Sequence, residues 1–85
     1  MNVEEKKIGF VKHYFSKIGV AAIELTDGEL SVGDTIHIKG HTTDFIQQIE
    51  SMQIEHQNVQ HAQIGDNIGI KVKEHTRDHD IVYKV

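Results

Sequence analysis

Histidine is the residue type whose abundance first suggests chemistry in this sequence. The 85 residues include 7 histidines and no cysteine. The segment 75–80 reads His-Thr-Arg-Asp-His-Asp, and His37 and His41 repeat the same spacing of two imidazoles. Zinc and iron accept such ligands. Residues four apart converge on a helix, however, and both pairs fall among strand and turn signals without a clear third ligand. We therefore expect solvated turn histidines, no metal and no cofactor.

A second group of residues interleaves cations with aromatic rings. The segment 12–17 reads Lys-His-Tyr-Phe-Ser-Lys. Small β-barrels hold single-stranded RNA by stacking bases on aromatic rings beside a few cations. If the first and last strands are neighbours, lysines near the C-terminus join the same face. The candidate RNA- or partner-binding residues are Lys12, His13, Tyr14, Phe15, Lys17, Lys71 and Lys73.

The alternative for this segment is structural. Tyr14 and Phe15 then straddle the end of a strand, with one ring in the core and the other on the rim. Charge composition limits the RNA hypothesis, because 9 Lys and Arg against 13 Asp and Glu give a net charge of −4. Nonspecific nucleic-acid binding depends on neutralising phosphates, so the overall charge argues against it but leaves a local basic face open.

Catalytic residues are not evident in the sequence. No serine lies in a nucleophile elbow, and a thiol nucleophile is excluded. The segment 28–35 has the glycine spacing of a phosphate-binding loop, but Asp34 stands where that motif needs lysine. We expect neither enzymatic activity nor GTP binding.

The composition indicates one soluble globular domain, with 38% hydrophobic and 26% charged residues. Residues 1–7 form a polar lead-in without the apolar centre of a secretory signal, and we assign residues 8–85 to a single domain. No stretch approaches the roughly 20 apolar residues of a membrane span. We expect a cytoplasmic protein.

Short runs rich in isoleucine and valine lie between seven glycines and predict about six strands. The apolar run 20–23 suggests a strand covered on both faces. The expected strands are 8–15, 19–25, 35–39, 67–72 and 81–85, with a further strand within 42–57. A closed barrel would remove the exposed edges of such a sheet.

The segment 42–57 supports two interpretations. Phe45, Ile49 and Met52 follow a helical spacing. Alternation also runs through the segment, in two phases that change near Ser51. A β-bulge at that point would make one long bent strand. We favour the bulged strand and keep a helical turn as the alternative.

Three blocks of sequence carry a resemblance to a known family. The segment 28–38 is similar to the G-x-L-x-V-G-D-x-(V/I)-x-I signature of the second domain of elongation factor Tu and related translational GTPases. The segments 49–53 and 59–70 resemble two further blocks of that domain in the same order. The ending, 77–85, resembles stand-alone translation elongation factor-like proteins and also the small barrel appended to certain collagenase-like peptidases.

The resemblance implies an all-β fold, a six-stranded closed antiparallel β-barrel of the reductase, isomerase and elongation factor common type. It implies a non-catalytic binding module that docks to RNA, such as tRNA or rRNA, or to a translation-associated protein. The GTPase domain of the family has no counterpart in this sequence. The alternative is a protein-interaction accessory subunit of a peptidase-like or RNA-modifying enzyme.

Overall fold

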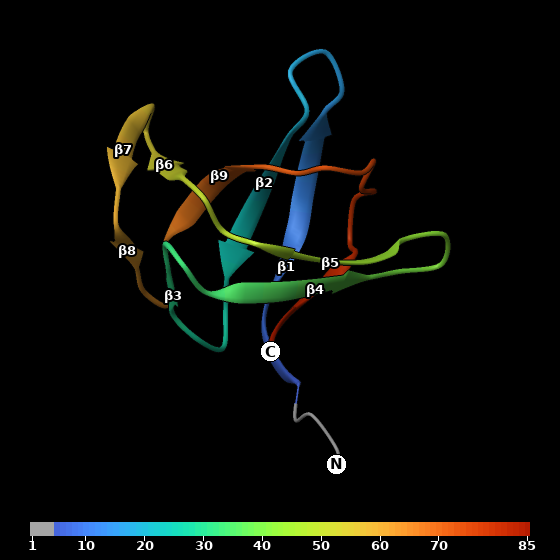
Figure 1. Cartoon of the computed structure of the whole chain (residues 1–85), viewed down its shortest axis with the longest axis horizontal. Helices are drawn as coiled ribbons and strands as arrows, with labels where there is room; N and C mark the ends of the chain where they lie inside the picture. The colour runs from blue at the N-terminus through green and yellow to red at the C-terminus, as the bar shows by residue number, and fades with distance from the viewer. Residues whose placement is uncertain (1–4) are drawn as a thin grey trace.

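The computed structural model describes residues 5–85, which fold into strands without a helix. Eight strands form one antiparallel sheet in the order β5-β4-β10-β1-β2-β9-β6-β7, and β3 pairs with β8 in a small ribbon (Figure 1). The bounds are β1 Lys6–Phe15, β2 Val20–Leu25, β3 Leu30–Ser31, β4 Thr35–Lys39, β5 Asp44–Gln48, β6 Met52–Ile54, β7 Gln57–Val59, β8 His61–Ala62, β9 Asn67–Lys71 and β10 Ile81–Lys84. Strand β1 thus includes Lys6 and Lys7 of the expected lead-in, and residues 1–4 lie outside the described part.

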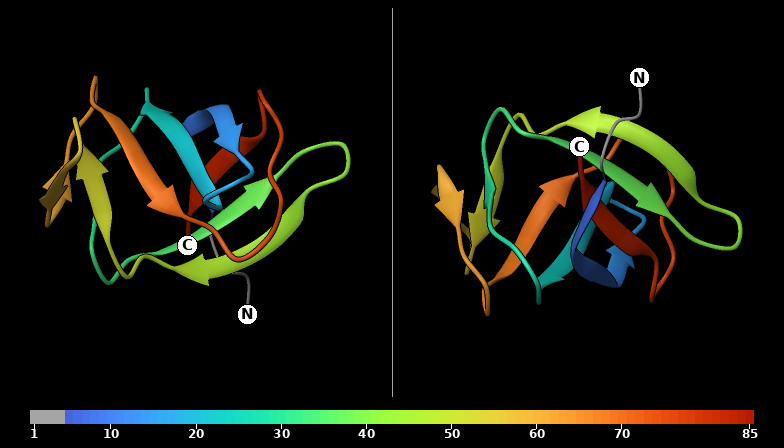
Figure 2. Two further views of the ribbon diagram at one scale, coloured as in Figure 1. Left: turned by 90° about the horizontal axis from the view of Figure 1, so that it is seen from above. Right: turned by 90° about the horizontal axis from the view of Figure 1, so that it is seen from below.

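Alternation along the strands places one set of side chains inside the curled sheet. In β4, Ile36 and Ile38 are buried, and in β9, Ile68 and Ile70 are buried. Successive side chains of a strand point to opposite faces, so every second residue of each long strand enters the same core. The views from above and below show the strands curling around this centre (Figure 2). The all-β prediction is therefore confirmed.

The prediction of a closed six-stranded barrel is wrong, because the sheet forms a half-barrel of eight strands. Strand β5 pairs with β4 near one end of the sheet, whereas β6, which follows it in the chain, pairs with β9 near the other end. Residues 49–51 connect the two and belong to neither strand. One continuous segment thus reaches both ends of the curled sheet, and no backbone ladder joins β5 to β9 among the described residues.

The gap between β5 and β9 is here called the seam. A side chain bridges it in place of a backbone ladder. The Gln47 Nε2 donates to the carbonyl of Lys71 at 2.9 Å, and its Oε1 accepts from the amide of Lys73 at 3.0 Å. A carboxamide has the same donor and acceptor as a peptide group. The side chain of Gln47 therefore supplies the two hydrogen bonds that another strand would make.

The segment 42–57 contains two separate strands, β5 and β6, and the first residue of β7, so the single bulged strand and the helical turn are both wrong. The interruption at 49–51 falls where the two alternation phases meet near Ser51. The short strands β3, β7 and β8 are not among the strands expected from the sequence. The expected neighbourhood of the first and last long strands is confirmed, because β1 pairs with β10.

Three turns of the chain share one geometry. In each, an aspartate carboxylate accepts the backbone N–H of the residue three positions earlier, at 2.8–2.9 Å, and the residue before the aspartate has a positive φ. The aspartates are Asp34, Asp66 and Asp80. Glycine occupies the positive-φ position of the first two turns, but His79 occupies the third with φ 75°. A non-glycine residue in this region carries a conformational penalty.

The shared geometry predicts that removing glycine from the first turn and introducing it into the third have opposite effects on stability. We expect Gly33→Ala to lower the free energy of unfolding by about 1–2 kcal/mol, and His79→Gly to raise it by up to about 1 kcal/mol. No atom lies within 4 Å of the position of a Cβ on Gly33, so the Cβ of alanine meets no steric clash there. The stability lost in Gly33→Ala therefore measures the cost of the backbone conformation alone. Urea denaturation measures both values. A stabilised Gly33→Ala variant would contradict the assignment.

Candidate binding surface

The candidate residues at the start of the segment 12–17 make local ion pairs. Lys12 lies at a register shift of β1, and its Nζ is 3.6 Å from the carboxylate of Glu24 on β2. His13 Nδ1 is 3.8 Å from the carboxylate of Asp78. Both contacts are largely exposed, and such pairs contribute little to stability. Lys12 and His13 therefore lie at the surface with their charges partly matched.

Tyr14 and Phe15 point to opposite sides of β1. Tyr14 packs against the core, and its ring centroid lies 4.5 Å from that of His75. Phe15 is 46% exposed and makes an edge contact of 4.6 Å with the ring of His13. The arrangement has one ring inside and one on the rim, as the structural alternative expected. The binding role predicted for these residues stays a prediction.

Phe15 and Lys71 are brought onto one row of the outer face. Phe15 pairs with Val20 across β1 and β2, and Val20 pairs with Lys71 across β2 and β9. Directly opposed residues of antiparallel strands project from the same face. Ala22 and Gly69 are paired in the next row that faces outward. The sheet is therefore low at its centre, because Ala22 and Gly69 carry almost no side chain.

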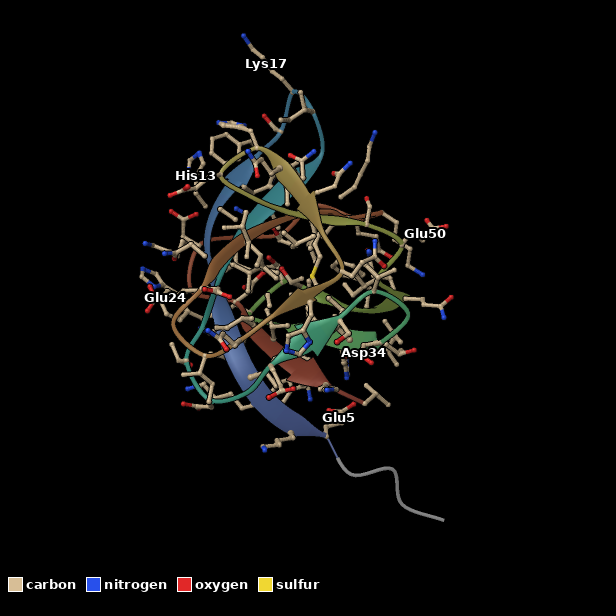
Figure 3. All side chains as sticks on the ribbon, turned by 90° about the vertical axis from the view of Figure 1, so that its left-hand side faces the viewer. Glu5, His13, Lys17, Glu24, Asp34 and Glu50 are labelled. Carbon is tan, nitrogen blue, oxygen red and sulfur yellow. The ribbon has the colours of Figure 1, made fainter. Side chains whose placement is uncertain are left out.

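A depression of about 340 Å³, here called the outer trough, follows from this arrangement. The β1–β2 hairpin contributes one wall through Phe15 and Ile18, and the β6–β7 hairpin contributes the other through Glu55 and His56. The full lining is Phe15, Ile18, Val20, Ala22, Gln53, Glu55, His56, Asn67, Ile68 and Gly69. Figure 3 shows the loop of Lys17 rising beside this face of the molecule.

Lys71 and Lys73 also line a second hollow at the seam. This hollow has a volume of about 510 Å³, and Gln47, Glu50 and Ser51 form its opposite side. The predicted site residues are therefore divided. Phe15 and Lys71 share a row of the outer face, Tyr14 packs inward, and Lys73 lies at the seam.

The residues at the centre of the outer trough were missed from the sequence. Their signal was the apolar run 20–23, which predicted a strand covered on both faces. The prediction is wrong for this chain, because Ala21 and Ile23 are buried in the core while Val20 and Ala22 face the trough and are only half-buried. The run therefore marks an apolar outer face that the described residues leave uncovered.

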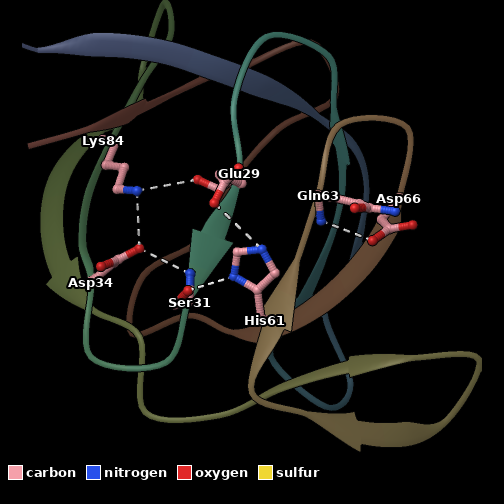
Figure 4. A network of polar contacts seen from close by, with 7 residues as sticks. All are labelled: Glu29, Ser31, Asp34, His61, Gln63, Asp66 and Lys84. Carbon is pink, nitrogen blue, oxygen red and sulfur yellow. Dashed lines mark hydrogen bonds and ion pairs between the residues drawn. The ribbon is translucent and has the colours of Figure 1, made fainter.

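On the β3–β8 ribbon a serine is hydrogen-bonded to a histidine, and a glutamate lies within ion-pair distance of that histidine (Figure 4). Ser31 Oγ lies 2.7 Å from His61 Nδ1, and His61 Nε2 lies 3.5 Å from the carboxylate of Glu29. The sequence indicated no such grouping, because the two strands are 30 residues apart. The residue types match those of a hydrolase triad.

The surroundings of Ser31 do not complete a hydrolase site. Acyl transfer needs free amide donors near the nucleophile to stabilise the oxyanion. The Ser31 amide donates to the Asp34 carboxylate, and the amides of Val32 and Gly33 donate to backbone carbonyls. Ser31 and His61 are directly opposed across the ribbon. Their hydrogen bond is therefore a cross-strand contact that stabilises two very short strands.

His37 is the centre of a charged cluster on β4. Its Nδ1 is hydrogen-bonded to the carboxylate of Glu5 and its Nε2 to that of Asp44. The His37 side chain is 12% exposed, whereas that of Asp44 is 71% exposed. The hydrogen bond that His37 donates to Asp44, and then the one it donates to Glu5, raise the pKa of His37, against an opposing effect of burial. The same contact with His37 lowers the pKa of Asp44.

Neither histidine pair of the sequence forms part of a metal centre in residues 5–85. No group of three or more histidine and carboxylate side chains there is arranged to hold a metal ion. Over the same residues, no helix is long and apolar enough to cross a membrane.

Comparison with known proteins corrects the resemblance to elongation factor Tu. A stretch of 72 residues is 46% identical to a collagenase of Porphyromonas gingivalis, covering 84% of this chain. A stretch of 78 residues is 41% identical to an uncharacterized protease of Methanocaldococcus jannaschii, covering 91% of this chain. The relatives are proteases, not translation factors. The elongation-factor assignment is therefore wrong, and the alternative likeness to collagenase-like peptidases agrees with these relatives.

A solved structure shares the fold of this chain. The C-terminal domain of a Geobacillus thermoleovorans protein described as a U32 peptidase matches with a TM-score of 0.85 and 21% identity, over 99% of both chains. No protein-family profile matches the chain. The chain spans about a fifth of the length of the curated relatives it matches, at 20% of the collagenase and 19% of the protease. The likeness is thus to one segment of longer proteins.

The His37 cluster predicts a pH dependence of stability. A raised pKa stabilises the fold fully below the ordinary histidine value of 6.5, and this contribution is lost as the pH rises through the higher folded value. The lowered pKa of Asp44 stabilises the fold above its ordinary value of 3.8, and that contribution is lost at lower pH. We expect His37→Gln to reduce the urea midpoint most between these two values.

The control for this prediction is His41→Gln, since His41 is exposed and makes no ion pair with the described carboxylates. Urea midpoints of the three proteins at about pH 5.5 and about pH 9 provide the comparison. If His37→Gln lowers the midpoint equally at both pH values, the coupling to Asp44 and Glu5 does not operate.

Proposed function

We propose that this chain is a non-catalytic accessory β-domain of the U32 peptidase group that docks onto a peptidase-like polypeptide through protein contacts. The observation that carries the proposal is the unequal coverage of the sequence matches. They account for 84–91% of this chain but only 17–20% of each relative. About four-fifths of each relative therefore lies outside the matched segment, and a domain of this kind is the smaller part of a larger protein.

The outer face supports protein contacts. Phe15 and Ile18 are 46% and 61% exposed, and they flank the outer trough. Half-buried apolar residues, Val20 and Ala22, lie on the adjoining strand. An apolar face of this kind is a mark of a protein interface. RNA binding has weaker support, because Lys12 is already paired with Glu24 and Tyr14 packs inward.

Ser31 lacks the surroundings that a catalytic serine needs. Its hydroxyl has an imidazole partner, but the amides beside it are occupied, so an oxyanion formed there would have no backbone donor. Glu29 and His61 are also half exposed or more, where water weakens the ion pair between them. The domain therefore contributes binding and leaves the chemistry to the rest of the assembly.

Co-purification tests the docking function. The tagged chain is recovered from its own cells in two halves, one treated with nuclease, and the bound proteins are identified by mass spectrometry. We expect a U32 peptidase-like polypeptide in equal amount in both halves. Ribosomal proteins or tRNA that vanish on nuclease treatment would instead support the RNA alternative and contradict the proposal.

A serine-reactive probe tests the absence of catalysis. We expect a fluorophosphonate to leave Ser31 unlabelled, because a hydroxyl without oxyanion stabilisation does not react readily. Ser31→Ala should lower the free energy of unfolding by about 0.5–1.5 kcal/mol through loss of its hydrogen bond to His61. Stoichiometric labelling that disappears in both Ser31→Ala and His61→Ala would show an active serine and contradict this part of the proposal.

A further inference from the structure

We propose that the outer trough is a self-association surface whose occupant is the β1–β2 hairpin of a second copy of this chain. The inference goes beyond the proposed function, because it names a second copy of this chain as a further partner of the outer face, which fills the trough when the peptidase-like polypeptide is absent. It follows from the shape of this face, its charges and the conformation of the hairpin that bounds it.

The face carries a projection beside a depression. Phe15 and Ile18 stand out from the β1–β2 hairpin with exposed fractions of 46% and 61%. The adjoining trough has a volume of about 340 Å³ and an apolar floor that includes Ala22 and Gly69. An apolar projection next to an apolar hollow on the same surface can fill the hollow of another copy. A two-fold axis beside the hairpin makes this exchange reciprocal.

The charges on the two walls are opposite in sign. Lys17 lies on the β1–β2 hairpin next to Ile18, and Glu55 lies on the β6–β7 hairpin. Neither residue makes an ion pair within residues 5–85. When the hairpin of one copy enters the trough of another, its Lys17 approaches the wall that carries Glu55. The surface is thus complementary to itself, whereas a purely basic or purely acidic partner would meet one repulsive wall.

The wall with Glu55 is held in an unfavourable conformation. Glu55 and His56 form the two-residue turn between β6 and β7, and both have positive φ, at 51° and 65°. Asparagine and glycine are the residues that suit such a turn. Non-glycine residues at positive φ carry a penalty of roughly 1 kcal/mol or more each. Their side chains line the trough, where contact with a second copy can offset that penalty.

The size of the surface predicts a weak dimer. A standard interface buries about 800 Å² on each partner, and smaller ones are transient. The described chain exposes 5572 Å² in total, so a standard interface would occupy roughly a seventh of it. An interface made of one trough and one hairpin on each copy buries less area than a standard interface and belongs with the transient ones. We therefore expect dissociation constants of roughly 10–500 µM.

Sedimentation equilibrium on the isolated chain, from about 10 µM to about 1 mM, measures this directly. We expect a monomer–dimer equilibrium in which Ile18→Glu raises the dissociation constant by at least about 10-fold. Ile46→Glu is the matched control, because Ile46 is 49% exposed but lies on β5 at the opposite end of the sheet. Far-ultraviolet circular dichroism confirms that each variant is folded.

Two further sets of variants test the details of the contact. Lys17→Glu and Glu55→Lys should each weaken the dimer, and the double exchange should recover most of the loss. Gly69→Val should fill the trough and weaken the dimer without unfolding the chain, since a Cβ at that position lies at an ordinary 3.5 Å from Val20. Replacing Glu55 and His56 by Asn and Gly should stabilise the fold while weakening association.

Three results would overturn the proposal. They are a wild-type monomer at about 1 mM, equal weakening by Ile18→Glu and Ile46→Glu, and a double charge exchange that recovers nothing. A monomer that still co-purifies with a peptidase-like polypeptide, and loses it in Ile18→Glu, would assign the trough to that polypeptide. This last result would reject self-association and leave the proposed function in place, so the two failures are distinguishable.

Discussion

The curl of the sheet is the constraint on which the rest of the structure depends. The segment that carries β5 and β6 reaches both ends of the sheet, so its position fixes how far the other strands must bend around the core. Residues 49–51 belong to no strand, and the carboxamide of Gln47 connects β5 to the backbone of Lys71 and Lys73. A core of isoleucine and valine can then be enclosed by a domain of 85 residues that has no disulfide. Small domains have a narrow margin of stability, and this enclosure is what makes the core sufficient.

The curl of the sheet also determines the shape of its outer face. Most inner positions of β2 and β9 are filled by large aliphatic residues, whereas the small residues Ala22 and Gly69 are paired on the outer face. The hairpins on either side extend beyond the sheet, so small residues between them leave a hollow. The same strands thus provide a core on one face and an apolar contact surface on the other. Because the second surface is independent of the core, it can vary without changing the fold.

The sequence was sufficient for the features that depend on local chemistry. Alternating Ile36 and Ile38, or Ile68 and Ile70, identify strands, and the Gly-Asp pairs at 33–34 and 65–66 identify turns. In the third turn histidine stands at 79 where the other two have glycine, so the sequence did not reveal the positive φ at that position. Closure was mispredicted because a single glutamine side chain replaces a ladder there, and alternation does not reveal such a contact. The resemblance to translation factors rested on core and turn positions, which are determined by the fold and not by what the protein binds.

The seam bridged by Gln47 makes the domain sensitive to deamidation of that one side chain. The amide proton of Lys73 is held by one side-chain oxygen and not by a neighbouring strand. Hydrolysis of that carboxamide to a carboxylate would remove the Nε2 donor and set a negative oxygen against the carbonyl of Lys71. Deamidation of Gln47 alone would therefore separate β5 from the segment of Lys71 and Lys73, while the hydrophobic core stays intact. Isotope exchange at the Lys73 amide reports that opening separately from unfolding of the whole domain.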